Sequence, residues 1–333
     1  MTSRREFIRG LTYASAAGLP SLRSRPAAAE PAPETSTIRL YKFPGICLAP
    51  QYIAEELLRA EGFADVQYVT LPEGPGRMPE RLGAGAVDMT QWYVAPFIAE
   101  IDKGTGVVIL GGIHTGCQEL FGTEVIRTIL DLKGKTIAAP SVSPTTSYVV
   151  AMLTSVGLDH RRDVRFVEHS LVESVQLLAG GKIDALMATP PISQELRAKK
   201  IGRVVVDTAT DRPWSQYFCC GVVANNDFVH KHPVAAKRAL RAIVKADQIC
   251  ALEPERAARV IVERGFTKSY DYALQAMKEV PYGRWRQYEI EDAVRFYALR
   301  LHEAGVIKSN PKKIIADGTD WRFINELKKE LKG

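Results

Sequence analysis

A loop rich in hydroxyl groups is the feature of the sequence that most directly suggests binding chemistry. Residues 141–147 read Ser-Val-Ser-Pro-Thr-Thr-Ser and lie between a predicted strand and a predicted helix. Hydroxyls and backbone N–H groups at a helix start can receive an anion or another polar ligand, and Pro144 suits the first helical turn. The alternative is ordinary capping of the helix, which needs only one hydroxyl. The candidate ligand contacts in this loop are Ser141, Ser143, Thr145, Thr146 and Ser147.

Aromatic and small side chains follow several other predicted strands. An aromatic ring in such a loop can stack on a ligand, and its alternative role is that of a partly buried core residue. A lone histidine is more often structural than a ligand group, so both roles stay open for His114. The candidates in the first half of the chain are Pro44, Gly45, Ile46, Cys47, Trp92, Tyr93 and His114. In the second half they are Thr189, Pro190, Trp214 and Tyr217.

The cysteines do not follow a metal-binding pattern. There are five of them, an odd number, and none are spaced as Cys-x-x-Cys, so we expect them in the core or lining a pocket, with neither a metal nor a cofactor. Cys219 and Cys220 are expected on a strand, where neighbouring side chains point to opposite faces and cannot chelate one ion. No Gly-x-Ser-x-Gly sequence and no Gly-rich phosphate loop occurs, so no catalytic residue is predicted.

Strands and helices alternate along the first part of the chain. Strands are predicted at 38–41, 66–71, 87–89 and 107–111, with helices between them at 50–60, 79–82 and 96–103. The order then recurs, with strands at 135–139, 164–168 and 183–188 and helices at 145–155 and 173–179. Such alternation is typical of parallel sheets covered by helices, which places the chain in the α/β class.

Short echoes indicate that this α/β unit is duplicated. Residues 85–88 (Gly-Ala-Val-Asp) are matched by residues 181–184 (Gly-Lys-Ile-Asp), and a second match follows in register between 62–69 and 163–167. One such turn could be chance, whereas two in register favour duplication. The duplication predicts two lobes with a ligand cleft between them, at the carboxyl ends of the strands.

The lobes are predicted to share the chain unequally. The first lobe is assigned to residues 38–126, the second is an insertion over 127–218, and residues 219–333 return to the first lobe. The pattern after Pro233 is helical to the C-terminal region, with helices closed by Gly265 and Gly305. We expect these helices to pack on the first lobe.

The first residues resemble an export signal. Arg4 and Arg5 stand in a charged region, a short apolar stretch follows, and residues 27–29 (Ala-Ala-Ala) offer a cleavage site. Residues 1–29 are therefore predicted to be a twin-arginine signal peptide leading to the periplasm, and residues 30–37 a linker. A disordered basic tail is the alternative interpretation.

Removing this segment nearly neutralises the chain. Residues 1–29 hold five arginines and one glutamate, a net charge of +4 out of the total of +6, which leaves +2. Since the basic excess lies mainly in the predicted signal, neither nucleic acid nor a membrane surface is implied as a partner.

Several of these segments carry a family resemblance. Residues 52–54 (Tyr-Ile-Ala), the two Gly-x-x-Asp turns and above all residues 131–138 (Asp-Leu-Lys-Gly-Lys-Thr-Ile-Ala) resemble the nitrate/taurine/sulfonate-type binding proteins of ABC transporters. That group shares its fold with the thiamine-pyrimidine precursor proteins. The resemblance implies a type II periplasmic-binding-protein fold with a hinge, in a monomer that delivers its ligand to permease subunits with a cytoplasmic ATPase. It leaves sulfonate, nitrate-like anion, pyrimidine or another small organic acid open as ligand.

Two other functions stay open beside transport. Relatives in the thiamine-precursor group include a pyrimidine synthase with a cysteine-rich motif, of which only residues 218–220 (Phe-Cys-Cys) are similar here. A periplasmic sensor subunit that binds a solute and signals to a membrane partner would have the same sequence features.

Overall fold

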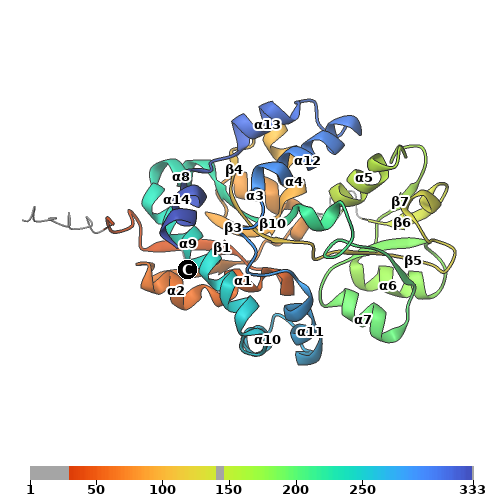
Figure 1. Cartoon of the computed structure of the whole chain (residues 1–333), viewed down its shortest axis with the longest axis horizontal. Coiled ribbons are helices and arrows are strands. Elements are labelled where there is room, and N and C mark those ends of the chain that lie inside the picture. Colours follow the sequence, from red (N-terminus) through yellow and green to blue (C-terminus); the bar gives the residue numbers. More distant parts are fainter. Residues whose placement is uncertain (1–29, 140–145, 332–333) are drawn as a thin grey trace, which may run out of the picture. The chain divides into compact units, whose positions relative to one another are not determined.

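The computed structural model describes residues 30–139 and 146–331 (Figure 1). The predicted signal peptide and the candidates Ser141, Ser143 and Thr145 lie outside these residues. No helix in the described part of the chain is both long and apolar enough to cross a bilayer.

The first sheet has five strands in the order β2-β1-β3-β10-β4. They are β2 (Asp65–Val69), β1 (Thr37–Tyr41), β3 (Met89–Tyr93), β10 (Phe218–Asn225) and β4 (Val107–Thr115). β1 pairs in parallel with β2 and β3, whereas β10 runs antiparallel to both β3 and β4. Every residue of β3, β4 and β10 is buried, because helices cover both faces of the sheet.

The second sheet repeats this arrangement in the order β7-β6-β8-β5-β9. Its strands are β7 (Arg165–Val167), β6 (Thr136–Ala138), β8 (Ala185–Ala188), β5 (Glu119–Gly122) and β9 (Arg203–Asp207). As in the first sheet, the fourth strand is antiparallel to its neighbours. β5 already belongs to this sheet, although the sequence assigned residues up to 126 to the first lobe. The shared strand order confirms the duplication.

The echoed Gly-x-x-Asp turns have one structural purpose in both units. Asp88 accepts a hydrogen bond from the backbone N–H of Arg39 in β1 at 2.7 Å, and Asp184 accepts one from Thr136 in β6 at 2.8 Å. Each aspartate thus ties the turn before the third strand to the first strand of its sheet. The glycine opening each turn has a positive φ, which a residue with a Cβ adopts only at a cost.

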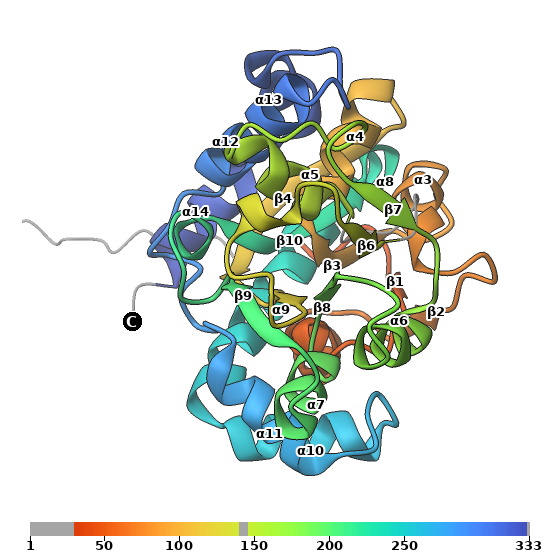
Figure 2. The same cartoon turned by 90° about the vertical axis from the view of Figure 1, so that its right-hand side faces the viewer.

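Helices from distant parts of the sequence enclose the first sheet. One face packs on α2 (Glu55–Ala60), α9 (Pro233–Leu252) and α14 (Arg322–Glu330) through an apolar cluster that includes Leu40 and Leu110. The other helices of this region are α1 (Ala49–Ile53), α3 (Met78–Gly83), α4 (Val94–Lys103), α8 (Asn226–Lys231), α10 (Pro254–Glu263), α11 (Tyr270–Glu279), α12 (Ile290–Glu303) and α13 (Pro311–Gly318). The second sheet carries α5 (Thr146–Ser155), α6 (Leu171–Ala179) and α7 (Ile192–Lys199) (Figure 2).

Within the described residues the chain passes between the sheets twice, and the two passages touch. The first runs from the end of β4 at Thr115 to β5, and the second from β9 to β10. Thr208 in the second passage accepts from the N–H of Gln118 at 3.0 Å and donates its hydroxyl to the Gln118 carbonyl at 2.7 Å. Gly116 lies so close that a Cβ would stand 2.3 Å from the Thr208 carbonyl oxygen. The passages therefore form one hydrogen-bonded unit.

Candidate functional site

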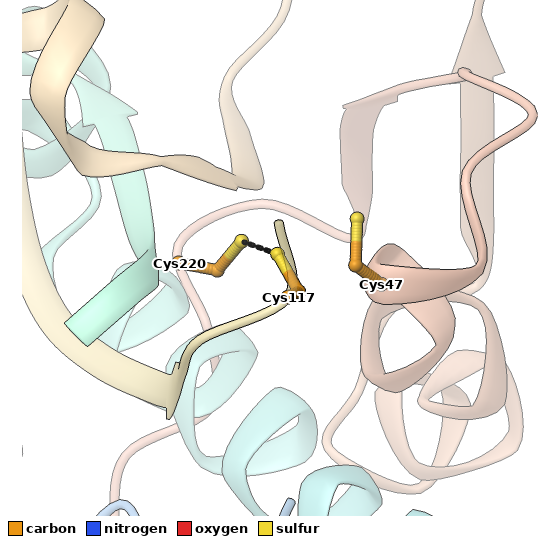
Figure 3. Close-up of side chains that lie close together, drawn as sticks. All are labelled: Cys47, Cys117 and Cys220. Carbon is orange, nitrogen blue, oxygen red and sulfur yellow. Dashed lines mark hydrogen bonds between the residues drawn. The ribbon is translucent and has the colours of Figure 1, made fainter. Parts of the chain in front are cut away.

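Four buried cysteines from three segments meet near the passages between the sheets. Cys47 lies in a short 3-10 helix (Ile46–Leu48), Cys117 in the first passage, and Cys219 and Cys220 at the start of β10. The Cys117 sulfur lies 3.1 Å from that of Cys219 and 3.9 Å from that of Cys220. The sulfurs of Cys47, Cys117 and Cys220 all lie within 4.8 Å of one another (Figure 3). We call these four residues the thiol cluster.

The expectation that the side chains of Cys219 and Cys220 point to opposite faces of a strand is wrong. Both sulfurs lie within 4 Å of the same sulfur, that of Cys117. The reason is an irregularity in the pairing of β10 with β4, whose register shifts between Phe218 and Cys220 and again before Gly221. A bulge turns neighbouring side chains away from strict alternation.

Two tyrosines border the cluster. The Tyr93 hydroxyl lies 3.4 Å from the Cys47 sulfur, and the Tyr148 hydroxyl donates to the Cys219 carbonyl at 2.6 Å. Their rings are 6.2 Å apart and nearly perpendicular. Tyr93 ends β3 of the first sheet, whereas Tyr148 belongs to α5 of the second, so both halves contribute to this site.

Burial and mutual hydrogen bonding set the ionisation of these groups. Hydrogen bonds from the Cys117 and Cys220 thiols lower the pKa of Cys47 well below its ordinary value. Burial raises the pKa of Cys117 well above its ordinary value, and it does the same for Tyr93. Burial also raises the pKa of Cys220, whereas the pKa of Cys219 is lowered well below its ordinary value, because its burial is outweighed by hydrogen bonds from the Cys117 and Cys220 thiols. Cys47 and Cys219 are therefore the two thiols of the cluster that ionise more readily, and Cys117 and Cys220 stay neutral donors.

His114 is fully buried in β4, and both of its ring nitrogens face backbone carbonyl oxygens rather than an open cavity. Its Nε2 lies 3.1 Å from the Cys47 carbonyl oxygen, and its Nδ1 lies 3.2 Å from that of Thr115. Gln91 donates to the same Cys47 carbonyl at 2.7 Å. These two side chains position the turn that presents the Cys47 thiol.

The other candidates after the first strand are Pro44, Gly45 and Ile46. Pro44 is exposed and Gly45 is buried. The backbone at Ile46 is held by Tyr282, whose hydroxyl donates to the Ile46 carbonyl at 3.0 Å. Gly283, next to Tyr282, donates its N–H to the Asp247 carboxylate of α9 at 2.9 Å. A chain of contacts thus runs from α9 to the cysteine turn.

Asp247 gives this chain a pH dependence. Burial raises the pKa of its carboxyl well above the ordinary value, so the folded protein holds a proton that the unfolded chain releases near pH 4. Stability contributed by this group is therefore lost as the pH rises above about 4. We expect Asp247→Asn to raise the free energy of unfolding relative to the parent at pH 8 and to change it much less at pH 4. Chemical denaturation at both values checks this, and a difference independent of pH would contradict it.

Trp92 lies within β3 rather than in a loop after it, because the strand runs to Tyr93 and not only to residue 89 as predicted. Its side chain is 0% exposed and packs edge-on against Tyr41 and Phe43, with ring centroids 5.2 and 5.1 Å away. The indole Nε1 is buried and has no hydrogen-bond partner within the described residues. The side-chain amide nitrogen and oxygen of the fully buried Gln118 likewise have no hydrogen-bond partner among the described residues.

The remaining candidates lie at two cavities and a helix. Thr146 and Ser147 line a cavity of about 360 Å³ with Pro96, Val150 and Phe166. Pro190, which follows the half-buried Thr189, lines another of about 280 Å³ that reaches Cys117. Trp214 and Tyr217 instead pack on Phe296 of α12, with centroids 5.6 and 4.1 Å away.

The cavity at Cys117 is charged. Its lining includes Glu119, Asp207, Glu279 and Arg197. Arg197 forms ion pairs with Glu119, at 3.4 Å, and with Glu279 of α11. Burial raises the pKa of Glu119 to about 7, against the opposing effect of Arg197.

The structure thus brings together Cys47, Tyr93 and His114 of the predicted set. It adds Cys117, Cys219, Cys220 and Tyr148, which were not among the predicted ligand contacts. A sequence signal existed for the cysteines, because 117 follows the predicted fourth strand and 219–220 lie where the chain was expected to cross back.

Comparisons with known proteins agree with this architecture. The family model described as NMT1/THI5 like matches residues 50–257, and no curated protein matches. The alkanesulfonate-binding protein SsuA from Xanthomonas axonopodis pv. citri bound to MOPS is similar with a TM-score of 0.70 and 16% identity, over 88% of this chain and 100% of that one. The periplasmic nitrate-binding protein NrtA from Synechocystis PCC 6803 gives 0.74 and 16%, over 91% and 90%.

An enzyme shares the fold as well. The desulfurization enzyme DSZB is similar with a TM-score of 0.59 and 16% identity, over 88% of this chain and 99% of that one. At such identities the likeness establishes the fold alone. The predicted α/β periplasmic-binding-protein fold with a helical C-terminal region is confirmed.

Proposed function

The chain belongs to the NMT1/THI5-like family, and from this premise we propose that it is a solute-binding protein. It captures a small organic or anionic molecule and delivers it to the permease of an ABC transporter. Sulfonate, nitrate-like anion and pyrimidine are the solute classes to test, since the structures with the same fold include alkanesulfonate- and nitrate-binding proteins.

One observation carries the proposal: side chains from both sheets meet at one buried site. The Tyr148 hydroxyl on α5 reaches the Cys219 carbonyl on β10, beside Tyr93 on β3. Binding between two lobes assembles the contact set only when both halves take part. Among the described residues, the indole Nε1 of Trp92 and the side-chain amide of Gln118 have no hydrogen-bond partner. A bound solute can supply hydrogen bonds to these polar groups.

A thermal-shift screen tests this function directly. Sulfonates, nitrate, pyrimidines, aromatic acids and polyamines are added to the purified chain, and a bound solute is expected to raise the unfolding temperature increasingly as its concentration exceeds its Kd, because the stabilisation grows as RT ln(1 + [L]/Kd). Tyr148→Phe is expected to weaken that solute about 3- to 10-fold, because a hydrogen bond of about 1 kcal/mol between the halves is lost. Tyr270→Phe in α11 is the matched control. Equal affinity in the two variants, or no stabilising solute at all, would count against the proposal.

Export by the twin-arginine route to the periplasm, and action as a monomer with a permease and a cytoplasmic ATPase, are the finer parts of the proposal. We expect replacement of Arg4 and Arg5 by lysine to retain the precursor in the cytoplasm, because the paired arginines are read as an address. Immunoblots of periplasmic and cytoplasmic fractions measure this. Normal periplasmic accumulation of the double variant would refute the route.

A further inference from the structure

We propose that Cys47, Cys117 and Cys220 form a binding site for a soft divalent metal ion of the Zn²⁺ and Cd²⁺ class. Their sulfurs lie within 4.8 Å of one another, with 3.9 Å between Cys117 and Cys220. Two thiolates bound about 2.3 Å from one Zn²⁺ lie about 3.8 to 4.0 Å apart, depending on the angle. The three sulfurs therefore need only small side-chain rotations to share an ion.

The type of ligand selects the type of metal. The trio offers sulfur alone, and thiolate ligands favour soft ions over Mg²⁺ or Ca²⁺, which require oxygen. The sulfurs are also deeply buried, with Cys47 and Cys220 0% and Cys117 5% exposed. Three thiolates leave one net negative charge with a divalent ion and two with Cu⁺, and burial of the larger charge costs more. The geometry and charge together favour the divalent class.

Cys219 stands beside the trio rather than in it. Its sulfur lies 3.1 Å from that of Cys117, closer than two sulfurs on one ion, and its carbonyl is held by Tyr148. Three protein ligands leave the fourth position of a tetrahedral ion open, as in sites where an ion meets a solute or water.

The backbone around the trio is held in place by buried contacts. Gln91 and His114 fix the Cys47 carbonyl, and the Tyr93 hydroxyl contacts the Cys47 sulfur. Cys220 pairs with both Tyr93 and His114 in the sheet. Such outer contacts orient the ligands of a metal site.

An ion has a route to the cluster. The cavity of about 280 Å³ is lined by Cys117 and by Glu119, Asp207 and Glu279, against one cation, Arg197. An acidic lining raises the local concentration of cations.

The test is a metal titration of the purified full-length chain, reduced with a phosphine under nitrogen. Addition of Cd²⁺ is expected to develop the ultraviolet charge-transfer band of cadmium thiolates up to one ion per chain, and Zn²⁺ is expected to compete. Cys47→Ser and Cys220→Ser should each weaken Cd²⁺ by more than about 100-fold, since even outer contacts of a metal site are worth 10- to 100-fold. Cys250→Ala is the matched control, because Cys250 is a buried thiol of α9 outside the cluster, and it should bind Cd²⁺ as the parent does.

Several results would overturn the site. These are the absence of a cadmium thiolate band in the parent, equal affinity in Cys47→Ser and Cys250→Ala, or a Cys117–Cys219 disulfide found by mass spectrometry in the protein as isolated. Should the serine variants fail to fold, X-ray absorption of the Zn²⁺-loaded parent decides: a shell dominated by sulfur supports the site, and one of nitrogen and oxygen refutes it. The inference concerns the same site as the proposed solute, but the two fail separately, because the solute screen is scored without metal and the titration without solute.

Discussion

Trp92→Ala is expected to lower the free energy of unfolding by about 3–5 kcal/mol, since a fully buried aromatic is cut back to a methyl group. The indole packs on Tyr41, Phe43 and Tyr93, so its removal leaves a cavity among three aromatic rings. If Trp92 also contacts the solute, the binding free energy of the solute is expected to weaken separately, by about 1–3 kcal/mol. Urea denaturation and calorimetric affinity on the same preparation measure the two effects.

Trp92→Phe is the matched control, because it keeps an aromatic ring and removes the Nε1 donor. A Trp92→Ala protein that is much less stable but binds its solute normally would remove Trp92 from the site. A Trp92→Ala protein as stable as the parent would contradict the prediction that the buried indole stabilises the fold.

Gly116→Ala is expected to destabilise the protein by more than about 4 kcal/mol, a loss usually reserved for severe core damage. Its φ is +41°, and a Cβ would lie 2.3 Å from the Thr208 oxygen and from the Ala209 Cα. Both obstacles belong to the backbone, so relief would require the two passages to separate and to lose the hydrogen bonds between Gln118 and Thr208.

Gly157→Ala separates the two causes. Gly157 has a φ of +80° with nothing within 4 Å of a would-be Cβ, so alanine there pays only for the left-handed conformation, about 1–2 kcal/mol. Thermal and urea unfolding of both variants make the comparison. Similar losses in the two would show that the close approach at Gly116 contributes nothing.

The fold was predictable because it follows from local patterns. Alternating apolar runs located most strands, and the pattern after Pro233 was predicted to be helical, where α9 begins at Pro233. Strand ends were less predictable: β3 and β4 run on to Tyr93 and Thr115, through residues assigned to loops. Their extra length comes from pairing with β10, which lies far along the chain. A long-range partner leaves no mark in a short window of sequence.

The site was predictable only in part, for a related reason. Loops after strands pointed correctly to Cys47, Tyr93 and His114 as neighbours, since parallel strands end at a common edge. The approach of Cys219 and Cys220 to one sulfur depends on a bulge in β10, and strict alternation predicted the opposite. Tyr148 lies inside its helix, just after the hydroxyl-rich loop, and its contact with Cys219 joins residues 71 positions apart, which a short window of sequence does not show. Trp214 was predicted as a ligand contact of the second half of the chain, and its ring packs on Phe296 of a helix that begins at Ile290, far along the chain.

The position of Cys117 has a thermodynamic consequence. Its sulfur sits on one connection between the sheets and lies next to two sulfurs at the start of the strand that ends the other connection. Any ligand that bridges these sulfurs must bind one relative arrangement of the connections more tightly than others. By linkage, it then shifts the population of that arrangement, and a partner that favours a different arrangement must in turn weaken the ligand by the same factor. Binding of the ligand at the sulfurs and its release to a partner would thus be governed by the same coupling free energy.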